Sequence, residues 1–403
     1  MLKFIPTVKK KSYQFLLLTG LWVILPLLVV EFLMIILEPY LFKGFFQYDP
    51  DIGFRVRPYT KGSNQFGFND RDYPLDRTPE TTRLLILGDS YGWVGGLLEN
   101  YTAVLDNQLV HQFGENKIEV INAGYSMTHT GEQRKILEKY GMQYQPDLVI
   151  LGFFAGNDFH DAQPDRKRII VNDIYFDIHT QQELIIFGYP IIPQSRLLLL
   201  IQQKYKIFQK TRQNLFTSLT SPKSNNAEAE EEDPKNKPPL KYHWYSPGLP
   251  EATYLNIEMQ MLDFYNIQNY ESGKYQDRIQ LIFENIAAIA ELLKSNNTKF
   301  IVAIYPAAFQ VDESLTQKIF QTGNLNPEDF DLFLAQKILK EYLDNQGIPY
   351  IDLLDEFRAE QKNQPLYLKN DTHWNKAGNQ FAADILFENL VPVIEKIVKT
   401  PHP

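Results

Sequence analysis

Short, continuous runs of apolar residues recur along the chain, and each is followed by small or polar residues. Beyond the N-terminal region these runs lie at residues 83–87, 117–122, 147–154, 299–306 and 349–355. Apolar runs of this length without alternation are typical of strands buried on both faces, as in a parallel sheet. The pattern therefore predicts five parallel strands.

Segments with helical periodicity separate or follow these runs. They lie at residues 102–113, 131–141, 277–295, 329–345 and 376–398. Strands that alternate with helices predict right-handed crossovers and a doubly wound α/β sheet.

The apolar stretch at residues 15–37 is of another kind, because it is long and carries a single charge, Glu31. As a helix it would span roughly 34 Å at ~1.5 Å per residue, enough to cross a bilayer. Four lysines precede the stretch and one follows closely, which predicts a cytoplasmic N-terminus (residues 1–14) and an external remainder. Glu31 lies in the outer third, where a charge can reach water.

A cleaved signal peptide is the alternative interpretation of this stretch. Its apolar region would be shorter, and a small-residue cleavage site would follow it. Here Glu38, Pro39 and Tyr40 follow instead, which favours an uncleaved single-pass anchor.

The remainder divides into a juxtamembrane segment (38–82) and an α/β domain (83–398). Within the domain, residues 160–275 interrupt the strand–helix alternation and are interpreted as an insertion near the carboxyl edge of the sheet. Residues 221–239 contain few apolar residues and several prolines, so we expect a disordered loop there.

Three strand ends carry residues suited to acyl chemistry. Ser90 follows the first strand, Gly124 the second and Asn157 the third. If the first strand lies between the other two, these residues meet beyond the carboxyl ends of the strands, where open α/β sheets bind ligands. Ser90 would be the nucleophile, and the N–H groups of Ser90 and Gly124 with the Asn157 amide would form an oxyanion hole. Glycine at 124 would keep a side chain from crowding the substrate.

A serine nucleophile needs a base, and His373 is the best candidate among seven histidines. It follows the fifth strand, and Asp371 precedes it by two residues, so both side chains point the same way in an extended segment. The carboxylate would then orient the imidazole toward Ser90, as in a catalytic triad.

Each motif alone has a simpler explanation. Gly-Asp-Ser is often a turn, Asn-Asp a helix cap, and Asp-x-His occurs in metal sites. A metal site built from Asp158, Asp371 and His373 would lack a closed ligand set at familiar spacing. The motifs together, each at the end of a strand, favour the triad, with no metal or cofactor.

Composition narrows the class of protein further. The chain has 403 residues, no cysteine, and a net charge of −9 from 49 acidic and 40 basic residues. The absence of cysteine excludes disulfides and a thiol nucleophile. The negative charge argues against a nucleic-acid partner, which needs a basic surface.

With these residues in these positions, the chain resembles the SGNH hydrolases, also called the GDSL family. The matching motifs are GDS (88–90), NAGYS (122–126), AGND (155–158) and DTHW (371–374). The resemblance implies a three-layer α/β/α sandwich with a five-stranded parallel sheet in flavodoxin-like order. It also implies the triad and oxyanion residues above. The third motif departs from the family's usual Gly-x-Asn-Asp, since Gly156 directly precedes Asn157.

Through the DTHW motif and the predicted anchor, the chain looks most like extracytoplasmic members of the family that act on cell-envelope or exported polysaccharides. Some of those members are O-acetyltransferases. The resemblance thus implies a serine esterase or O-acyltransferase in the bacterial cytoplasmic membrane, with a periplasmic domain. An acylated glycan or a small ester would be its substrate. Hydrolysis and transfer stay open, as does a non-catalytic glycan-binding protein on the same fold; no oligomeric state is predicted. Candidate pocket residues are Asp89, Tyr91, Trp93, Asp158 and Trp374.

Overall fold

The computed structural model shows two compact units. The first comprises Met1–Phe54 and Lys167–Asn236, and the second comprises Arg55–Arg166 and Lys237–Pro403. The residues that the structure describes are 6–41, 44–78, 80–171, 174–179, 184–186, 189–192, 194–202, 204–205, 208–209, 212 and 245–398. The loop expected at 221–239 lies outside them.

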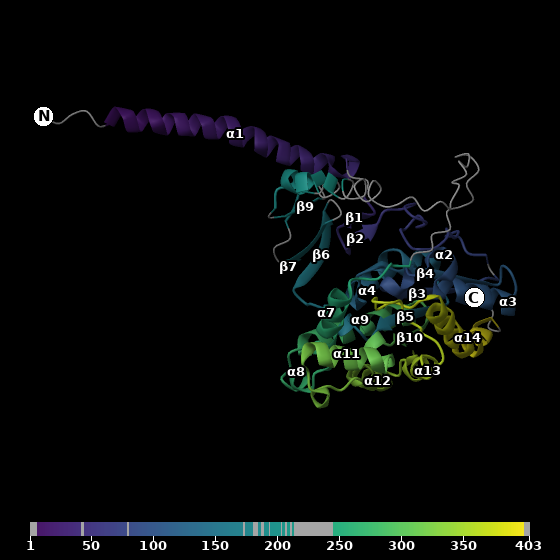
Figure 1. The fold of residues 1–403 in the computed structure, drawn as a ribbon. Helices are drawn as coiled ribbons and strands as arrows, with labels where there is room; N and C mark the ends of the chain where they lie inside the picture. Colours follow the sequence, from purple (N-terminus) through teal and green to yellow (C-terminus); the bar gives the residue numbers. More distant parts are fainter. Residues whose placement is uncertain are drawn as a thin grey trace, which may run out of the picture. The chain divides into compact units, whose positions relative to one another are not determined.

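The second unit is built on a five-stranded parallel sheet, and its strands β3, β4, β5 and β10 are labelled in Figure 1. Its order is β11-β10-β5-β3-β4, so the first strand of the domain lies between the second and third. The bounds are β3 Thr82–Gly88, β4 Ile118–Gly124, β5 Leu148–Phe154, β10 Lys299–Tyr305 and β11 Tyr350–Asp352. The predicted α/β class and flavodoxin-like order are confirmed.

Helices cover both faces of this sheet (Figure 1). On one face, α3 (Tyr101–Phe113) packs against α14 (Lys376–Val398). On the other, α4 (Thr130–Lys139) packs against α9 (Gln276–Ser295), and Phe283 of α9 stacks on Tyr342 of α12 (Leu334–Gln346). The doubly wound sheet predicted from the alternating pattern, and the three layers that the family resemblance implies, are therefore present.

Shorter helical elements connect these layers. They are η1 Ser90–Gly92, α2 Gly96–Glu99, η2 Gly141–Tyr144, α5 Asp158–Asp161, α7 Glu251–Leu262, η4 Asp263–Tyr265, α8 Ile267–Glu271, α10 Ala308–Val311, α11 Glu313–Gly323, η5 Pro327–Asp329 and α13 Leu354–Glu360.

The last strand is shorter than the apolar run at 349–355 predicts. β11 ends at Asp352, whose carboxylate accepts the N–H of Leu354 at 3.2 Å and so turns the chain into α13. Leu353 and Leu354 are buried as part of that turn and helix. An apolar run alone does not mark where such a turn begins.

The first unit contains the long helix α1 (Pro6–Leu41) and three two-stranded sheets that pair β1 with β2, β6 with β7 and β8 with β9. Their bounds are β1 Phe46–Asp49, β2 Gly53–Val56, β6 Arg166–Val171, β7 Ile174–His179, β8 Leu184–Ile186 and β9 Tyr189–Ile191. A small core is formed by Ile169, Val171, Ile192 and Leu199. Much of the predicted insertion thus folds with the N-terminal helix rather than with the large sheet.

Helix α1 contains one stretch, Leu18–Leu37, that is long and apolar enough to cross a membrane. Its mean hydropathy is 2.6, and only 6% of it is buried inside the protein.

Candidate active site

Ser90, His373 and Asp371 form a continuous hydrogen-bonded chain. The Nε2 atom of His373 lies 2.7 Å from Ser90 Oγ, and its Nδ1 atom lies 2.6 Å from Asp371 Oδ1. The same carboxylate oxygen accepts the backbone N–H of His373 at 3.0 Å. The same order of nucleophile, base and orienting acid is found in catalytic triads.

Ser90 is delivered by the end of the buried strand β3. The strand ends at Gly88, and the Asp89 side chain then accepts the N–H of Tyr91 at 3.0 Å, which caps the short helix η1. Ser90 is the first residue of η1, beyond the carboxyl end of the sheet. The abrupt change from apolar to polar residues therefore marks a capped turn that presents the serine.

A second contact joins the serine turn to the loop that carries His373. The Tyr91 hydroxyl donates to the carbonyl oxygen of Thr372 at 2.6 Å. The Tyr91 ring also lies against His373 and Trp374, with centroid distances of 5.2 Å and 4.5 Å. Tyr91 thus fixes the position of His373 relative to Ser90.

The environment of Asp371 favours its charged form. Partial burial opposes ionisation, but the hydrogen bonds and positive charge offered by His373 hold the pKa of Asp371 below its usual value. An ionised Asp371 keeps the proton of His373 on Nδ1 and leaves Nε2 free to accept the serine proton.

The two further oxyanion candidates lie at neighbouring strand ends. Gly124 closes β4, and Asn157 directly precedes α5. In this structure the Gly124 N–H donates to Asn122 Oδ1 at 3.0 Å, and Asn157 Nδ2 donates to Asp161 Oδ2 at 3.2 Å. An oxyanion would therefore share or replace these acceptors.

Packing of the protein backbone by itself accounts for glycine at position 124, and room for a substrate stays a prediction. A Cβ atom there would lie 2.9 Å from the Cα atom of Gly92 and 3.1 Å from Asn122 Oδ1. Real Cβ atoms do not approach another backbone this closely, so β4 and η1 can pack together only with glycine at both positions.

All five candidate pocket residues are buried and make contacts within the protein. Besides the roles of Asp89 and Tyr91 above, Trp93 Nε1 donates to the Gly124 carbonyl at 3.0 Å, and Asp158 Oδ2 accepts the Phe154 N–H at 3.0 Å. Trp374 packs edge-on against Tyr91. These contacts account for their burial, and a direct contact with substrate stays a prediction.

Sequence reasoning missed a polar cluster that holds the serine turn. Asn122 and Asn69 both donate to the carbonyl of Gly92, at 2.7 Å and 3.0 Å. Asp70 in turn accepts the N–H of Asn122 at 2.8 Å. The signal available in the sequence was an asparagine inside an otherwise apolar buried strand, which requires polar partners.

Glu258 of α7 is a further residue that the sequence did not indicate. It is fully buried. Burial raises its pKa to about 8, the nearby polar groups of Tyr254 and Thr372 oppose this rise, and the charge of Asp371 adds to it. A protonated Glu258 avoids placing a second negative charge near the triad.

Glu258→Gln is expected to flatten the pH dependence of stability. A carboxyl with a pKa near 8 when folded, against about 4.3 when unfolded, favours folding at low pH, and this contribution is lost as pH rises from about 4.5 to 8. The free energy of unfolding of the wild type therefore falls by at most about 1.4 kcal/mol per pH unit over this range because of Glu258, and the variant lacks this decrease. Chemical unfolding of the full chain in detergent at pH 5, 7 and 9 measures the difference.

Glu291→Gln, at an exposed position of α9, serves as the control and should follow the wild type. Parallel profiles for all three proteins would contradict the assignment.

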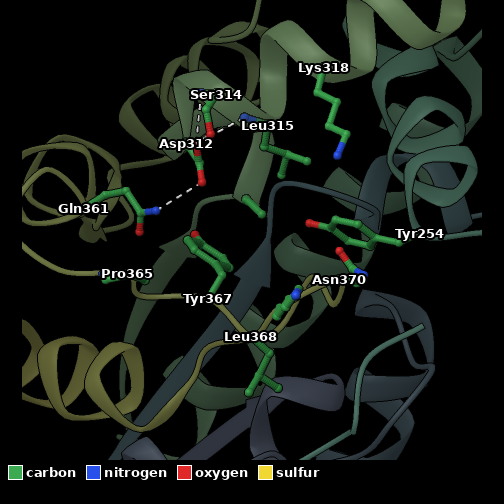
Figure 2. A pocket seen from close by; sticks show the side chains of 12 residues that line it. Tyr254, Asp312, Ser314, Leu315, Lys318, Gln361, Pro365, Tyr367, Leu368 and Asn370 are labelled. Carbon is green, nitrogen blue, oxygen red and sulfur yellow. Dashed lines mark hydrogen bonds between the residues drawn. The ribbon is translucent and has the colours of Figure 1, made fainter. Parts of the chain in front are cut away.

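A pocket of about 300 Å³ adjoins the segment that leads into Asp371. Figure 2 shows side chains from α7, from the start of α11 and from residues 361–370 directed toward this space. Several of its polar groups already have partners: Asp312 accepts from Ser314 and from Gln361, and Tyr367 donates to the Pro306 carbonyl. The carbon faces of Tyr254 and Tyr367 remain part of the lining.

The structure thus combines an α/β/α sandwich with a serine, a histidine and an aspartate at the carboxyl edge of its sheet. Comparison agrees: residues 264–400 match a family model described as SGNH hydrolase-like domain, acetyltransferase AlgX. The match includes Asp371 and His373 and confirms the predicted resemblance. No curated protein sequence matches the chain significantly.

Solved structures that resemble the chain include several esterases. The acetyl xylan esterase AlAXEase is 15% identical, with 77% of this chain and all of that chain covered and a TM-score of 0.38. Axe2, an acetylxylan esterase from Geobacillus stearothermophilus solved as a catalytic mutant, is 10% identical, with 78% and 97% covered and a TM-score of 0.38. A lipase/acylhydrolase from Enterococcus faecalis is 12% identical, with 80% and 100% covered and a TM-score of 0.35. At these values the structures do not identify a substrate for this chain.

Proposed function

We propose that the chain is a membrane-anchored serine acyl-ester hydrolase or O-acyltransferase that forms an acyl-serine intermediate. The observation that carries the proposal is the aligned chain from Ser90 through His373 to Asp371, with contacts of 2.7 Å and 2.6 Å. Three side chains at hydrogen-bond distance in this order activate a hydroxyl that is otherwise a poor nucleophile.

In the first half-reaction, Ser90 Oγ attacks the carbonyl carbon of the ester while His373 Nε2 takes its proton. The imidazolium that forms is stabilised by Asp371. Collapse of the tetrahedral intermediate breaks the ester bond, and His373 returns the proton to the departing alcohol. In the second half-reaction, water or a sugar hydroxyl attacks the acyl-serine by the same proton path.

The developing oxyanion would be held by the N–H groups of Ser90 and Gly124 and by the amide of Asn157. Donors of this kind stabilise the transition state more than the ground state. Asn122 and Asp161 orient the last two donors before substrate arrives, because they accept hydrogen bonds from them in the free site.

The domain would act outside the cytoplasmic membrane of a bacterium, on acyl groups of a glycan. Three observations support this placement: the apolar stretch Leu18–Leu37, the lysines before it, and the match to a domain described as an acetyltransferase. The pocket in Figure 2, with tyrosine rings and polar groups beside the Asp371 segment, is a suitable site for a sugar ring.

Product analysis tests the function and separates its two forms. The purified full chain in detergent is incubated with an acetyl ester as donor. An oligosaccharide with free hydroxyl groups, either unacetylated or partly acetylated, is present as acceptor in one set of reactions and absent from the other. Free acetate alone indicates an esterase, and acetylated sugar indicates a transferase. Neither product, with either acceptor, would contradict the proposal.

A non-catalytic glycan-binding protein is the competing function. A fluorophosphonate probe distinguishes the two, because it reacts only with an activated serine. We expect labelling at Ser90. A protein that binds oligosaccharide yet stays unlabelled would favour the binding function.

A further inference from the structure

Glu31, the acidic residue within the apolar stretch of α1, has partners from a distant part of the chain. Ser195 Oγ donates to its carboxylate at 2.7 Å, and the N–H of Leu197 does so at 3.2 Å. The N–H of Arg196 donates to the same carboxylate. These groups form the first turn of a helix that begins at Arg196, so Glu31 caps the N-terminus of this helix.

The position of Glu31 sets the depth at which this contact occurs. It lies six residues before Leu37, the end of the stretch long enough to span a membrane. Six residues of helix correspond to about 9 Å. If α1 spans the bilayer, the groups bonded to Glu31 therefore lie below the end of the apolar span. This is the depth of roughly 5–10 Å at which interfacial helices bury their apolar face.

The helix that begins at Arg196 exposes an apolar stripe. Leu198, Ile201, Tyr205 and Phe208 follow one another at intervals of three and four residues, and their exposed fractions are 59%, 54%, 60% and 62%. This spacing places them on one helix face. Among the described residues nothing covers them.

The opposite face of the same helix is held by the protein. Leu199 is buried in the small core with Ile169, Val171 and Ile192. A helix fixed to a core on one face normally presents polar residues on the other. Here the four apolar side chains of the outward face are spread over about 15 Å, the rise of ten residue steps from Leu198 to Phe208.

We propose that the helix beginning at Arg196 lies in the outer leaflet, with its stripe of Leu198, Ile201, Tyr205 and Phe208 in contact with lipid. The bilayer is favoured as the occupant because the first turn of this helix is bonded to a residue inside the membrane-spanning stretch. A tyrosine in the stripe suits the membrane–water interface. The inference rests on the membrane anchoring in the proposed function, and it gives the first unit two attachments to the membrane instead of one.

Site-directed spin labelling of the full chain in phosphatidylcholine/phosphatidylglycerol nanodiscs tests the proposal. The chain contains no cysteine, so single cysteines can be labelled cleanly. Labels are placed at Ile201→Cys and Tyr205→Cys, with Tyr59→Cys as the control, because Tyr59 is an exposed tyrosine (70%) in the second unit. We expect the stripe labels to collide more with oxygen, and at least about threefold less with a water-soluble nickel chelate, than the control does.

A label at Ile24→Cys, near the middle of the apolar stretch, separates failure of this proposal from failure of the anchor. Lipid exposure at Ile24 with water exposure at Ile201 and Tyr205 would overturn the interfacial helix and leave the anchor standing. Water exposure at Ile24 would overturn both. Stripe labels shielded from oxygen and nickel alike, with dipolar broadening between chains, would show that a second copy covers the stripe and would also overturn it.

Variants of Glu31 test the capping contact. Glu31→Gln retains an acceptor oxygen, whereas Glu31→Leu retains none. We expect nickel collision at Ile201→Cys to increase at least about twofold in Glu31→Leu and to stay near the wild-type value in Glu31→Gln. Equal values in both backgrounds would exclude Glu31 as the residue that docks the helix.

Discussion

Ser90→Ala is expected to lower kcat for acetyl-ester hydrolysis by about 10⁴- to 10⁶-fold, the range found when a triad nucleophile is removed. The expectation follows from the 2.7 Å contact between Ser90 Oγ and His373 Nε2, because alanine leaves the base with no hydroxyl to deprotonate. Ester hydrolysis by the purified full chain in detergent measures the loss, and fluorophosphonate labelling should disappear with it.

The fold of this variant should remain intact. Ser90 begins η1, but the cap of that helix is the Asp89 side chain, which the substitution leaves in place. Equal thermal unfolding of wild type and variant checks this point. Ser295→Ala, at the exposed end of α9, should keep full activity. A Ser90→Ala protein that retains wild-type turnover would rule out the acyl-serine mechanism.

Asp371→Asn should lower kcat by about 10⁴-fold while leaving the shape of the loop nearly unchanged. The neutral amide no longer stabilises the imidazolium, and its NH₂ group can hold the wrong His373 tautomer, with the proton on Nε2. In that tautomer Nε2 cannot accept the serine proton across the 2.7 Å contact.

Two readouts separate orientation of the base from general stability. The KM for the ester should change much less than kcat, since the Asp371 carboxylate is engaged by His373. Asp355→Asn, at an exposed position of α13, should retain wild-type turnover. A loss confined to KM would indicate that Asp371 binds substrate instead.

The sequence was sufficient to predict those parts of the fold that depend on local patterns. The run at 83–87 predicted β3 within one residue at each end, and the helix expected at 376–398 is α14. Both are long or strongly apolar segments, for which pattern and burial agree. The edge strand β11 was overestimated because a polar side chain, Asp352, ends it.

The candidate site could be predicted where residue chemistry and topology combine. Parallel strands with adjacent carboxyl ends bring together residues that are far apart in sequence, and Ser90 meets His373 across 283 positions. Glu258 could not be found this way, because it lies on a helix of the insertion and its burial depends on tertiary packing. The same holds for the contact of Glu31 with Ser195, which joins segments without any shared pattern.

The Tyr91–Thr372 hydrogen bond has a consequence for the timing of synthesis. At 5–20 residues per second the ribosome needs about 15–60 s to pass from the nucleophile to its base, a separation of 283 residues. During that interval the nascent chain lacks both His373 and the Thr372 carbonyl that accepts the Tyr91 hydroxyl. Under the proposed mechanism, reactivity toward esters can therefore arise only after residues 372 and 373 have emerged and folded against the serine turn.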